Sequence, residues 1–170
     1  HHHYHYRGAV INHQVHLRLF PDEEELHRAL ADLAADTKKP LGWVAPDVPL
    51  ISNLDIYGNI ALIRQYHENL PANESRRLVE GYLRRYGLEK TAAKRSSALT
   101  DAERLRVMLI RAVMVRDAVL VINQPLKIMP YDTDPGFLAE ALKVIDDSFK
   151  ECYIFDLAWN KDRYRITDAS

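Results

Sequence analysis

The stretch LTDAERLRVMLIRAVMVRDAVLVINQP, residues 99–125, decides the fold that we expect for this chain. Thr100 and Glu103 have the Ser/Thr-x-x-Glu spacing of a capping box, in which each side chain satisfies a free backbone amide at a helix start. Apolar residues then recur at helical spacing, and residues 118–122 form a continuous apolar run typical of a strand covered on both faces. Two carboxamides and a proline close this strand, Asn123-Gln124-Pro125.

The composition is that of a globular chain with little net charge. A length of 170 residues is enough for one domain with a sizeable core. The balance of 23 basic and 24 acidic side chains argues against a nucleic-acid-binding protein that relies on phosphate neutralisation. The single cysteine, Cys152, excludes an internal disulfide and fits a reducing compartment. No apolar run approaches the roughly 20 residues that span a bilayer, so we expect no direct insertion into a membrane.

Strand-like and helical stretches alternate along the chain, and a helical block interrupts them. Outside the stretch quoted above, the expected elements are a strand or hairpin in 6–20, a helix over 21–36, a strand at 41–45, helices within 51–98, a loop at 126–134, a helix opened by Asp134 and Pro135, and strands at 152–155 and 164–167. This order predicts an α/β fold, in which a mostly parallel sheet carries an inserted helical subdomain.

A single domain is expected over residues 6–170. Its sheet lobe would comprise residues 6–49 and 116–170, and its helical lobe residues 50–115. We expect residues 1–5 to be disordered or part of a purification tag, because the chain begins with three histidines. We therefore assign the N-terminal histidines no native metal role. The histidines further along, His13, His16, His27 and His67, show no spacing typical of a metal site.

Three segments, in this order and spacing, resemble ABC-type ATPases. LGWVAPDVPLISNLDIYGNIAL (41–62) resembles the stretch that leads from the Q-loop into the helical lobe of that family. Residues 99–125 resemble the signature helix and Walker B strand, and CYIFDLAWNKDRYRI (152–166) resembles the switch region. The resemblance implies a P-loop-NTPase-like sheet of the ABC-ATPase type, with an inserted helical subdomain and a shortened N-terminal β part.

The residues that carry ATPase chemistry in that family are replaced here. No GxxxxGK[ST] phosphate loop occurs, and acidic residues stand where its glycine, lysine, serine and threonine would be: Asp22, Glu23, Glu24 and Glu25. Carboxylates there would repel ATP, although they also complement the dipole of their own helix. The remaining replacements are Pro46 at the Q-loop glutamine, Thr100, Asp101 and Ala102 at the signature, Asn123 and Gln124 at the Walker B acids, Pro130 near the D-loop aspartate and Phe155 at the switch histidine.

Carboxamides give Mg²⁺ little charge and cannot act as a general base near neutral pH. We therefore expect a non-catalytic pseudo-ATPase without a cofactor, acting as a structural or regulatory partner in an ABC-transporter-type assembly. One alternative is a weakly active subunit that binds ATP and Mg²⁺. A second is a small-ligand sensor that uses the nucleotide cleft, with Trp43, Trp159 and Tyr153 as lining residues.

The resemblance also implies a partner surface between the Q-loop and the helical lobe, where the family receives its membrane subunit. Its residues here would be Leu50, Leu54, Ile56 and Tyr57. Ordinary packing in the helical lobe is the competing interpretation of the same apolar pattern. The expected partners are a second copy of the chain, an ABC ATPase or a membrane permease subunit, and not nucleic acid. The expected location is the cytoplasm, with the inner face of the membrane reached only through a partner.

Overall fold

The computed structural model describes residues 2–6, 15–36, 38–131, 134 and 136–168. Its centre is a six-stranded sheet with the strand order β3-β4-β5-β2-β1-β6. The strands are β1 (His2–Tyr6), β2 (Val15–Phe20), β3 (Leu41–Val44), β4 (Ala118–Asn123), β5 (Phe149–Leu157) and β6 (Ile166–Asp168). β3, β4, β5 and β2 pair in parallel, whereas β1 is antiparallel to both β2 and β6. The expected mixed α/β fold with a mostly parallel sheet is confirmed.

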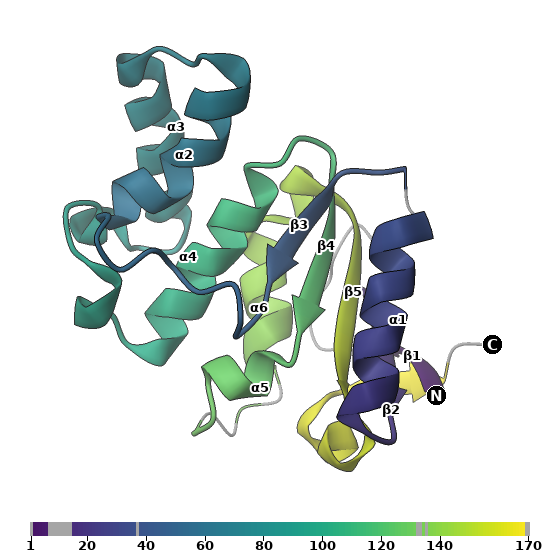
Figure 1. Ribbon diagram of the computed structural model, residues 1–170. Coiled ribbons are helices and arrows are strands. Elements are labelled where there is room, and N and C mark those ends of the chain that lie inside the picture. Colours follow the sequence, from purple (N-terminus) through teal and green to yellow (C-terminus); the bar gives the residue numbers. More distant parts are fainter. Residues whose placement is uncertain (1, 7–14, 37, 132–133, 135, 169–170) are drawn as a thin grey trace.

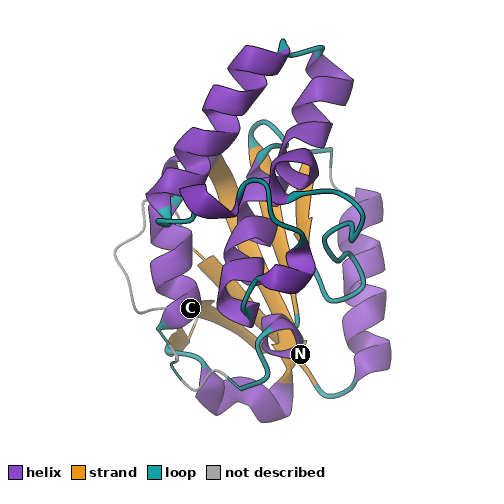
Figure 2. Cartoon of the chain, turned by 90° about the vertical axis from the view of Figure 1, so that its left-hand side faces the viewer, coloured by secondary structure: helices purple, strands orange, loops and turns teal. Residues whose placement is uncertain are grey.

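Helices lie against both faces of this sheet (Figures 1 and 2). They are α1 (Glu23–Asp36), α2 (Ile56–Glu68), α3 (Ala72–Arg85), α4 (Asp101–Val113), α5 (Pro125–Ile128) and α6 (Phe137–Val144), with short 3-10 turns at Glu89–Thr91, Ser96–Ala98, Asp146–Ser148 and Ala158–Arg163. Every residue of β4 is buried, as expected for a strand covered on both faces. The continuous apolar pattern of residues 118–122 predicts this burial on both faces.

Alternation along β2 assigns its side chains to two different cores. Val15, Leu17 and Leu19 face the main core, which also holds the inner faces of α4 and α6. Phe20 faces the other side, where it packs with Leu26 of α1 and with Phe155 and Leu157 of β5. α1 therefore covers β2 and β5 on the face opposite to α4.

The chain between β3 and β4 contains no strand in the structure, and it forms α2, α3, two 3-10 turns and α4. α2 and α3 pack on each other and on α4, beyond the sheet edge formed by β3 (Figure 1). Asp55 caps α2 by accepting a hydrogen bond from the Gly58 backbone N–H at 2.7 Å, and Asn69 ends the helix in a left-handed conformation. Thr100 and Glu103 form the predicted capping box at the start of α4.

Some sequence-based expectations differ from the structure. Residues 2–6 form β1 and pair with β2 and β6, so the expected disorder of residues 1–5 is wrong for the described part of that segment. The stretch after Gln124, expected to be a loop, begins with the short helix α5. The last strand starts at Ile166, two residues later than expected. Residue Pro135, expected to open α6, lies outside the described residues.

At Gly42, strand β3 lies close against the backbone of α4. A Cβ atom at this position would lie 2.4 Å from the backbone carbonyl oxygen of Ala112. We expect Gly42→Ala to lower the free energy of unfolding by about 1–3 kcal/mol, because either the strand or the helix backbone must move. Urea unfolding measures this change.

Gly81 provides the matched control, because a Cβ atom there meets no atom within 4 Å. Gly81 lies inside α3, so Gly81→Ala should raise the free energy of unfolding by about 0.5–1 kcal/mol through helix propensity alone. A Gly42→Ala protein as stable as the wild type would contradict the close approach of β3 and α4.

Candidate functional site

The carboxyl ends of the four parallel strands meet at one edge of the sheet, where α/β proteins place their ligand sites. Asn123 at the end of β4 lies in register beside Phe155 of β5. The Gln124 backbone N–H donates to the Phe155 carbonyl oxygen at 2.8 Å. Lys127 of α5 reaches across to Glu23 at the start of α1 and shares a pocket lining with Pro46. The structure thus brings together the positions that the sequence pointed to.

At the N-terminus of α1, one backbone amide is capped by a carboxylate of the chain itself, and the neighbouring carboxylates form ion pairs. The Glu25 backbone N–H donates to Asp22 Oδ1 at 2.8 Å, which makes Asp22 an N-capping side chain. Glu23 forms an ion pair with Lys127 at 2.6 Å, and this hydrogen bond holds the pKa of Glu23 below its ordinary value. Glu24 pairs with Arg28 one turn further along the same helix. A phosphate group approaching this helix end would meet carboxylates where a phosphate-binding loop offers bare amides.

Asn123 and Gln124 are nearly fully buried, with exposed fractions of 5% and 3%. Within the described residues, Asn123 Oδ1 and Gln124 Oε1 have no hydrogen-bond partner. Gln124 also has a left-handed backbone, with φ 49° and ψ 59°, which costs a non-glycine residue about 1–2 kcal/mol. Two buried carboxamide oxygens are therefore held in place by the surrounding fold and remain able to accept hydrogen bonds.

Phe155 and Asp156 have structural environments. Phe155 is fully buried and stacks on Phe20, with ring centroids 5.4 Å apart. The Asp156 carboxylate accepts hydrogen bonds from the Leu157 backbone N–H at 2.7 Å, from Asn160 Nδ2 at 3.0 Å and from the Tyr164 hydroxyl group. Burial, followed by the charge of Asp156, raises the pKa of Tyr164. Asp156 therefore secures the 3-10 turn that follows β5.

An open pocket of about 390 Å³ lies between α1, β3 and the end of β4. Its lining is mainly apolar and comes from His27, Leu30, Ala31, Ala34, Trp43, Ala45, Asp47, Val48 and Asn123. Of the three aromatic residues expected to line the nucleotide cleft, Trp43 lines this pocket. Trp159 is 69% exposed in the turn after β5, and Tyr153 stacks on His16.

A second open pocket, of about 330 Å³, separates the start of α4 from α5 and the end of β3. Asp101 and Arg104 line it from α4, and Pro46 and Pro130 line it from the loops. Asp101 is already paired with Arg104 at 2.8 Å, and Thr100 is engaged in the capping box. The side chains of Thr100 and Asp101 thus form their polar contacts with residues of the same helix. Ala102, the next residue, has no polar side-chain group.

The expected partner surface contains core residues. Leu50 and Ile56 are buried in the main core, and Leu54 and Tyr57 are partly buried, so Leu50 and Ile56 cannot present an outer face. Exposed apolar side chains occur at other positions of the same region, residues 48–69: Val48, Ile51, Leu62 and Tyr66. The apolar pattern alone does not show which of these side chains face outward, because that depends on the packing of the helices.

Two buried or half-buried side chains hold the loop that carries Val48 and Ile51. Asn59 Oδ1 accepts from the Ile51 backbone N–H at 2.7 Å, and Asn59 Nδ2 donates to the Ile51 carbonyl at 3.1 Å. Arg111 of α4 donates to the backbone carbonyls of Pro49 and Val48. Sequence reasoning missed both anchors, since a polar residue in an amphipathic helix gives no sign of which distant backbone it bonds.

Parts of the sequence are similar to known import ATP-binding proteins. No protein-family model matches the chain. The chain is 28% identical over 131 residues to the molybdate/tungstate import ATP-binding protein WtpC of Archaeoglobus fulgidus, covering 76% of this chain and 53% of that protein. It is 27% identical over 129 residues to the thiamine import ATP-binding protein ThiQ of a Jannaschia species, covering 75% and 54%. A shorter match, 31% over 84 residues, covers 45% of this chain and 30% of the phosphonates import ATP-binding protein PhnC of Rhizobium meliloti.

The chain is thus similar, over part of its length, to ABC-type import ATP-binding proteins. It spans about half the length of the WtpC and ThiQ proteins. Among the described residues, no helix has the length and apolar character of a segment that crosses a bilayer.

Removal of the Asp22 carboxylate tests the self-capped helix. We expect Asp22→Ala to lower the free energy of unfolding by about 1 kcal/mol, because the Glu25 amide loses its acceptor. Glu24→Gln, a matched change in the same exposed turn, should alter it by less than about 0.5 kcal/mol. Equal effects of the two substitutions in thermal or urea unfolding would show that Asp22 is not the cap.

Proposed function

We propose that this chain is a non-catalytic ABC-ATPase-like protein that acts by association within an ABC-transporter-type assembly. The relationship to import ATP-binding proteins supports the class of assembly. The observation that carries the loss of ATPase function is the N-terminus of α1, where Asp22 caps the helix and Glu23 is bound to Lys127. The place of a phosphate is taken by side chains of the protein itself.

The residues at the carboxyl ends of β4 and β5 support the same proposal. Proteins usually hold Mg²⁺ through one or two carboxylates together with water and substrate phosphates, whereas Asn123 and Gln124 supply neutral carboxamide oxygens. Gln124 cannot accept a proton from water near neutral pH, so it would not serve as a general base. The buried ring of Phe155 in turn offers no hydrogen bond to a nucleotide. Binding, metal coordination and proton transfer each lack their usual group.

Nucleotide binding provides the first test. A site with a dissociation constant of about 10 μM would stabilise the protein by roughly 2.7 kcal/mol at about 1 mM Mg²⁺-ATP. For a chain of this size that corresponds to a rise in Tm of roughly 5–11 °C. We expect no rise, while an ABC ATPase with an intact phosphate loop serves as the positive control. A rise in this range that is lost on Asn123→Ala would overturn the pseudo-ATPase proposal and favour the weakly active subunit.

Partner binding provides the second test. The exposed side chains Val48, Ile51, Leu62 and Tyr66 would form the contact with a membrane permease subunit, supported by the rigid loop that Asn59 and Arg111 hold. We expect the chain to co-sediment with a detergent-solubilised ABC permease from its own source. Ile51→Asp combined with Leu62→Asp should abolish this association, because two charges would be buried in an apolar contact.

Tyr131→Ser is the matched surface control for this experiment, since Tyr131 is 90% exposed and lies outside the 48–69 region. It should leave association unchanged. Sedimentation of the chain alone as a dimer, disrupted by the same Ile51 and Leu62 substitutions, would replace the permease by a second copy as the partner. Full association of the double variant would exclude this surface.

A small-ligand sensor is the second candidate, and the pocket beside Asn123 favours it. The pocket combines apolar walls from α1 and Trp43 with one buried carboxamide oxygen that has no partner in the described part of the chain. Such a pocket would suit a neutral ligand that donates a hydrogen bond. A ligand screen by thermal shift, repeated with Asn123→Leu, distinguishes this candidate from the first.

A further inference from the structure

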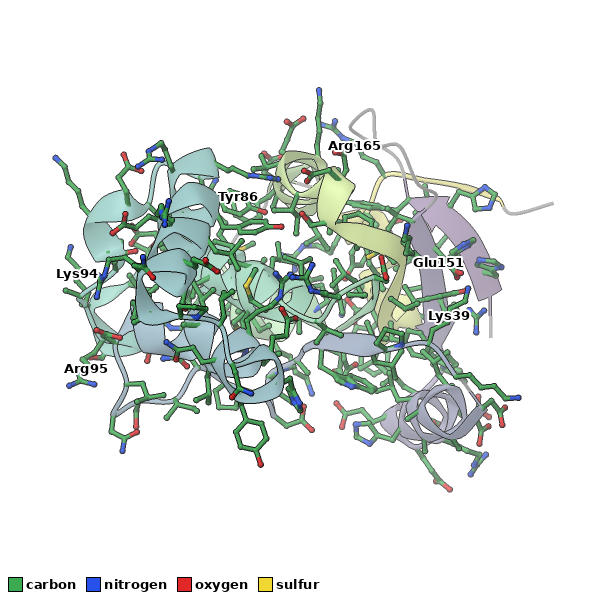
Figure 3. All side chains as sticks on the ribbon, turned by 90° about the horizontal axis from the view of Figure 1, so that it is seen from above. Lys39, Tyr86, Lys94, Arg95, Glu151 and Arg165 are labelled. Atoms are coloured by element: carbon green, nitrogen blue, oxygen red, sulfur yellow. The ribbon has the colours of Figure 1, made fainter. Side chains whose placement is uncertain are left out.

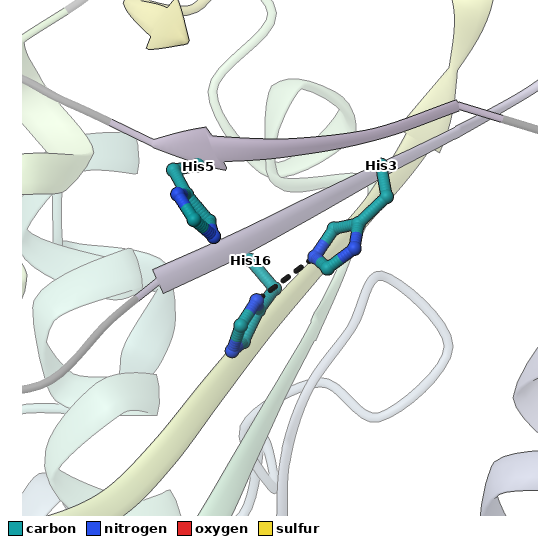
Figure 4. Close-up of side chains that lie close together, drawn as sticks. All are labelled: His3, His5 and His16. Carbon is teal, nitrogen blue, oxygen red and sulfur yellow. Dashed lines mark hydrogen bonds between the residues drawn. The ribbon is translucent and has the colours of Figure 1, made fainter. Parts of the chain in front are cut away.

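Three histidine side chains converge on one face of the antiparallel pair β1–β2. His3 and His5 occupy alternate positions of β1, so both point to the same side of the sheet. His16 of β2 is directly opposite His5 in the strand register. Figure 4 shows the three imidazoles gathered over the ribbon. The intervening residue of β1, Tyr4, is buried on the other face.

The ring nitrogens are close enough to share one ion. One nitrogen from each of His3, His5 and His16 lies within 4.8 Å of the other two. His3 Nε2 and His16 Nδ1 are 2.8 Å apart, which is a hydrogen-bond distance. Two nitrogens bound tetrahedrally to one zinc ion lie about 3.3 Å apart. Small side-chain rotations would therefore convert the present cluster into a coordination sphere.

We propose, in contrast to the expectation from the sequence that the N-terminal histidines have no native metal role, that His3, His5 and His16 form a binding site for a divalent transition-metal ion of the zinc class. Three neutral imidazoles suit zinc, cobalt or nickel, whereas magnesium and calcium require oxygen ligands. Three protein ligands leave the fourth tetrahedral position open for water or an exchangeable ligand. This donor set is independent of the sheet edge at the ends of β2–β5, and the proposal does not rest on the pseudo-ATPase function.

Neighbouring side chains support His16 from the strand on its other side. The Tyr153 ring of β5 stacks on the imidazole with centroids 4.9 Å apart and planes 21° apart. The Tyr153 hydroxyl donates to Glu151 Oε2 at 2.8 Å. Glu151 also pairs with Lys39, and the two side chains are labelled in Figure 3. Stacking on Tyr153 therefore limits the range of orientations open to the His16 ring, and small rotations remain possible.

The local electrostatics favour the neutral, metal-binding form of the imidazoles. Burial first, then His16, Arg18 and His5, lowers the pKa of His3. Burial first, then His5 and Arg18, lowers the pKa of His16, and Glu151 opposes this change. Arg18 is the one cation paired in register with His3, but its guanidinium lies over the Tyr153 ring at 4.9 Å from the centroid.

Calorimetric titration with Zn²⁺, with Mg²⁺ as the negative control, tests the proposal on the full chain. We expect one Zn²⁺ per chain, no Mg²⁺ binding, and the intense visible absorption of tetrahedral cobalt when Co²⁺ is used instead. His16→Ala should weaken Zn²⁺ binding by about a hundredfold or more, because a direct ligand contributes at least as much as an outer-shell partner. His67→Ala, an exposed histidine of α2, is the matched control and should bind as the wild type does.

The His16→Ala variant distinguishes the proposed site from metal binding by the histidines at the start of the chain alone. If His16→Ala retains wild-type affinity, the binding belongs to the N-terminal histidines alone and the proposal is overturned. Circular dichroism checks that each variant is folded. Should His16→Ala fail to fold, His16→Gln and His5→Ala replace it, and wild-type affinity with an unchanged cobalt spectrum in both would equally overturn the proposal.

Discussion

The burial of β4 on both faces is the constraint on which the rest of the structure depends. All six of its residues are buried between β3 and β5, so helices must cover the sheet on each side. Parallel pairing with both neighbours also makes the strand ends coincide. As a result, Asn123, Gln124 and the N-terminus of α1 come together at one edge of the sheet. This arrangement follows from strand pairing and does not depend on which side chains occupy those positions.

At that edge the protein satisfies its own polar groups from within. The Glu25 amide at the start of α1 donates to Asp22, Lys127 is paired with Glu23, and Asp101 is paired with Arg104. A P-loop protein presents free backbone donors to phosphate at this place, whereas here the helix start carries a capped amide and paired carboxylates. The buried oxygens of Asn123 and Gln124 are the contrasting case, because neither has a partner in the described residues.

The helical region shows how packing can change the meaning of an apolar pattern. Leu50 and Ile56 lie in the core, and the apolar surface comes from neighbours such as Ile51 and Leu62. The backbone of the loop 48–55 is held by hydrogen bonds with two polar residues, Asn59 of α2 and Arg111 of α4. Arg111 lies 62 positions from Pro49 in the sequence. A protein surface of this kind is set by buried polar anchors as much as by hydrophobic residues.

The sequence by itself determined the strand at 118–122, the capping box at Thr100, the helix after Pro21 and the mostly parallel α/β sheet, because these depend on local periodicity and on short-range hydrogen bonds. Only the tertiary structure decided which apolar residues of the 48–69 region face outward, that Trp43 rather than Trp159 lines a pocket, and that residues 2–6 form a strand. The convergence of His3 and His5 with His16 likewise depends on the register of β1 against β2, and a spacing of 13 positions between His3 and His16 carries no local signal of that pairing.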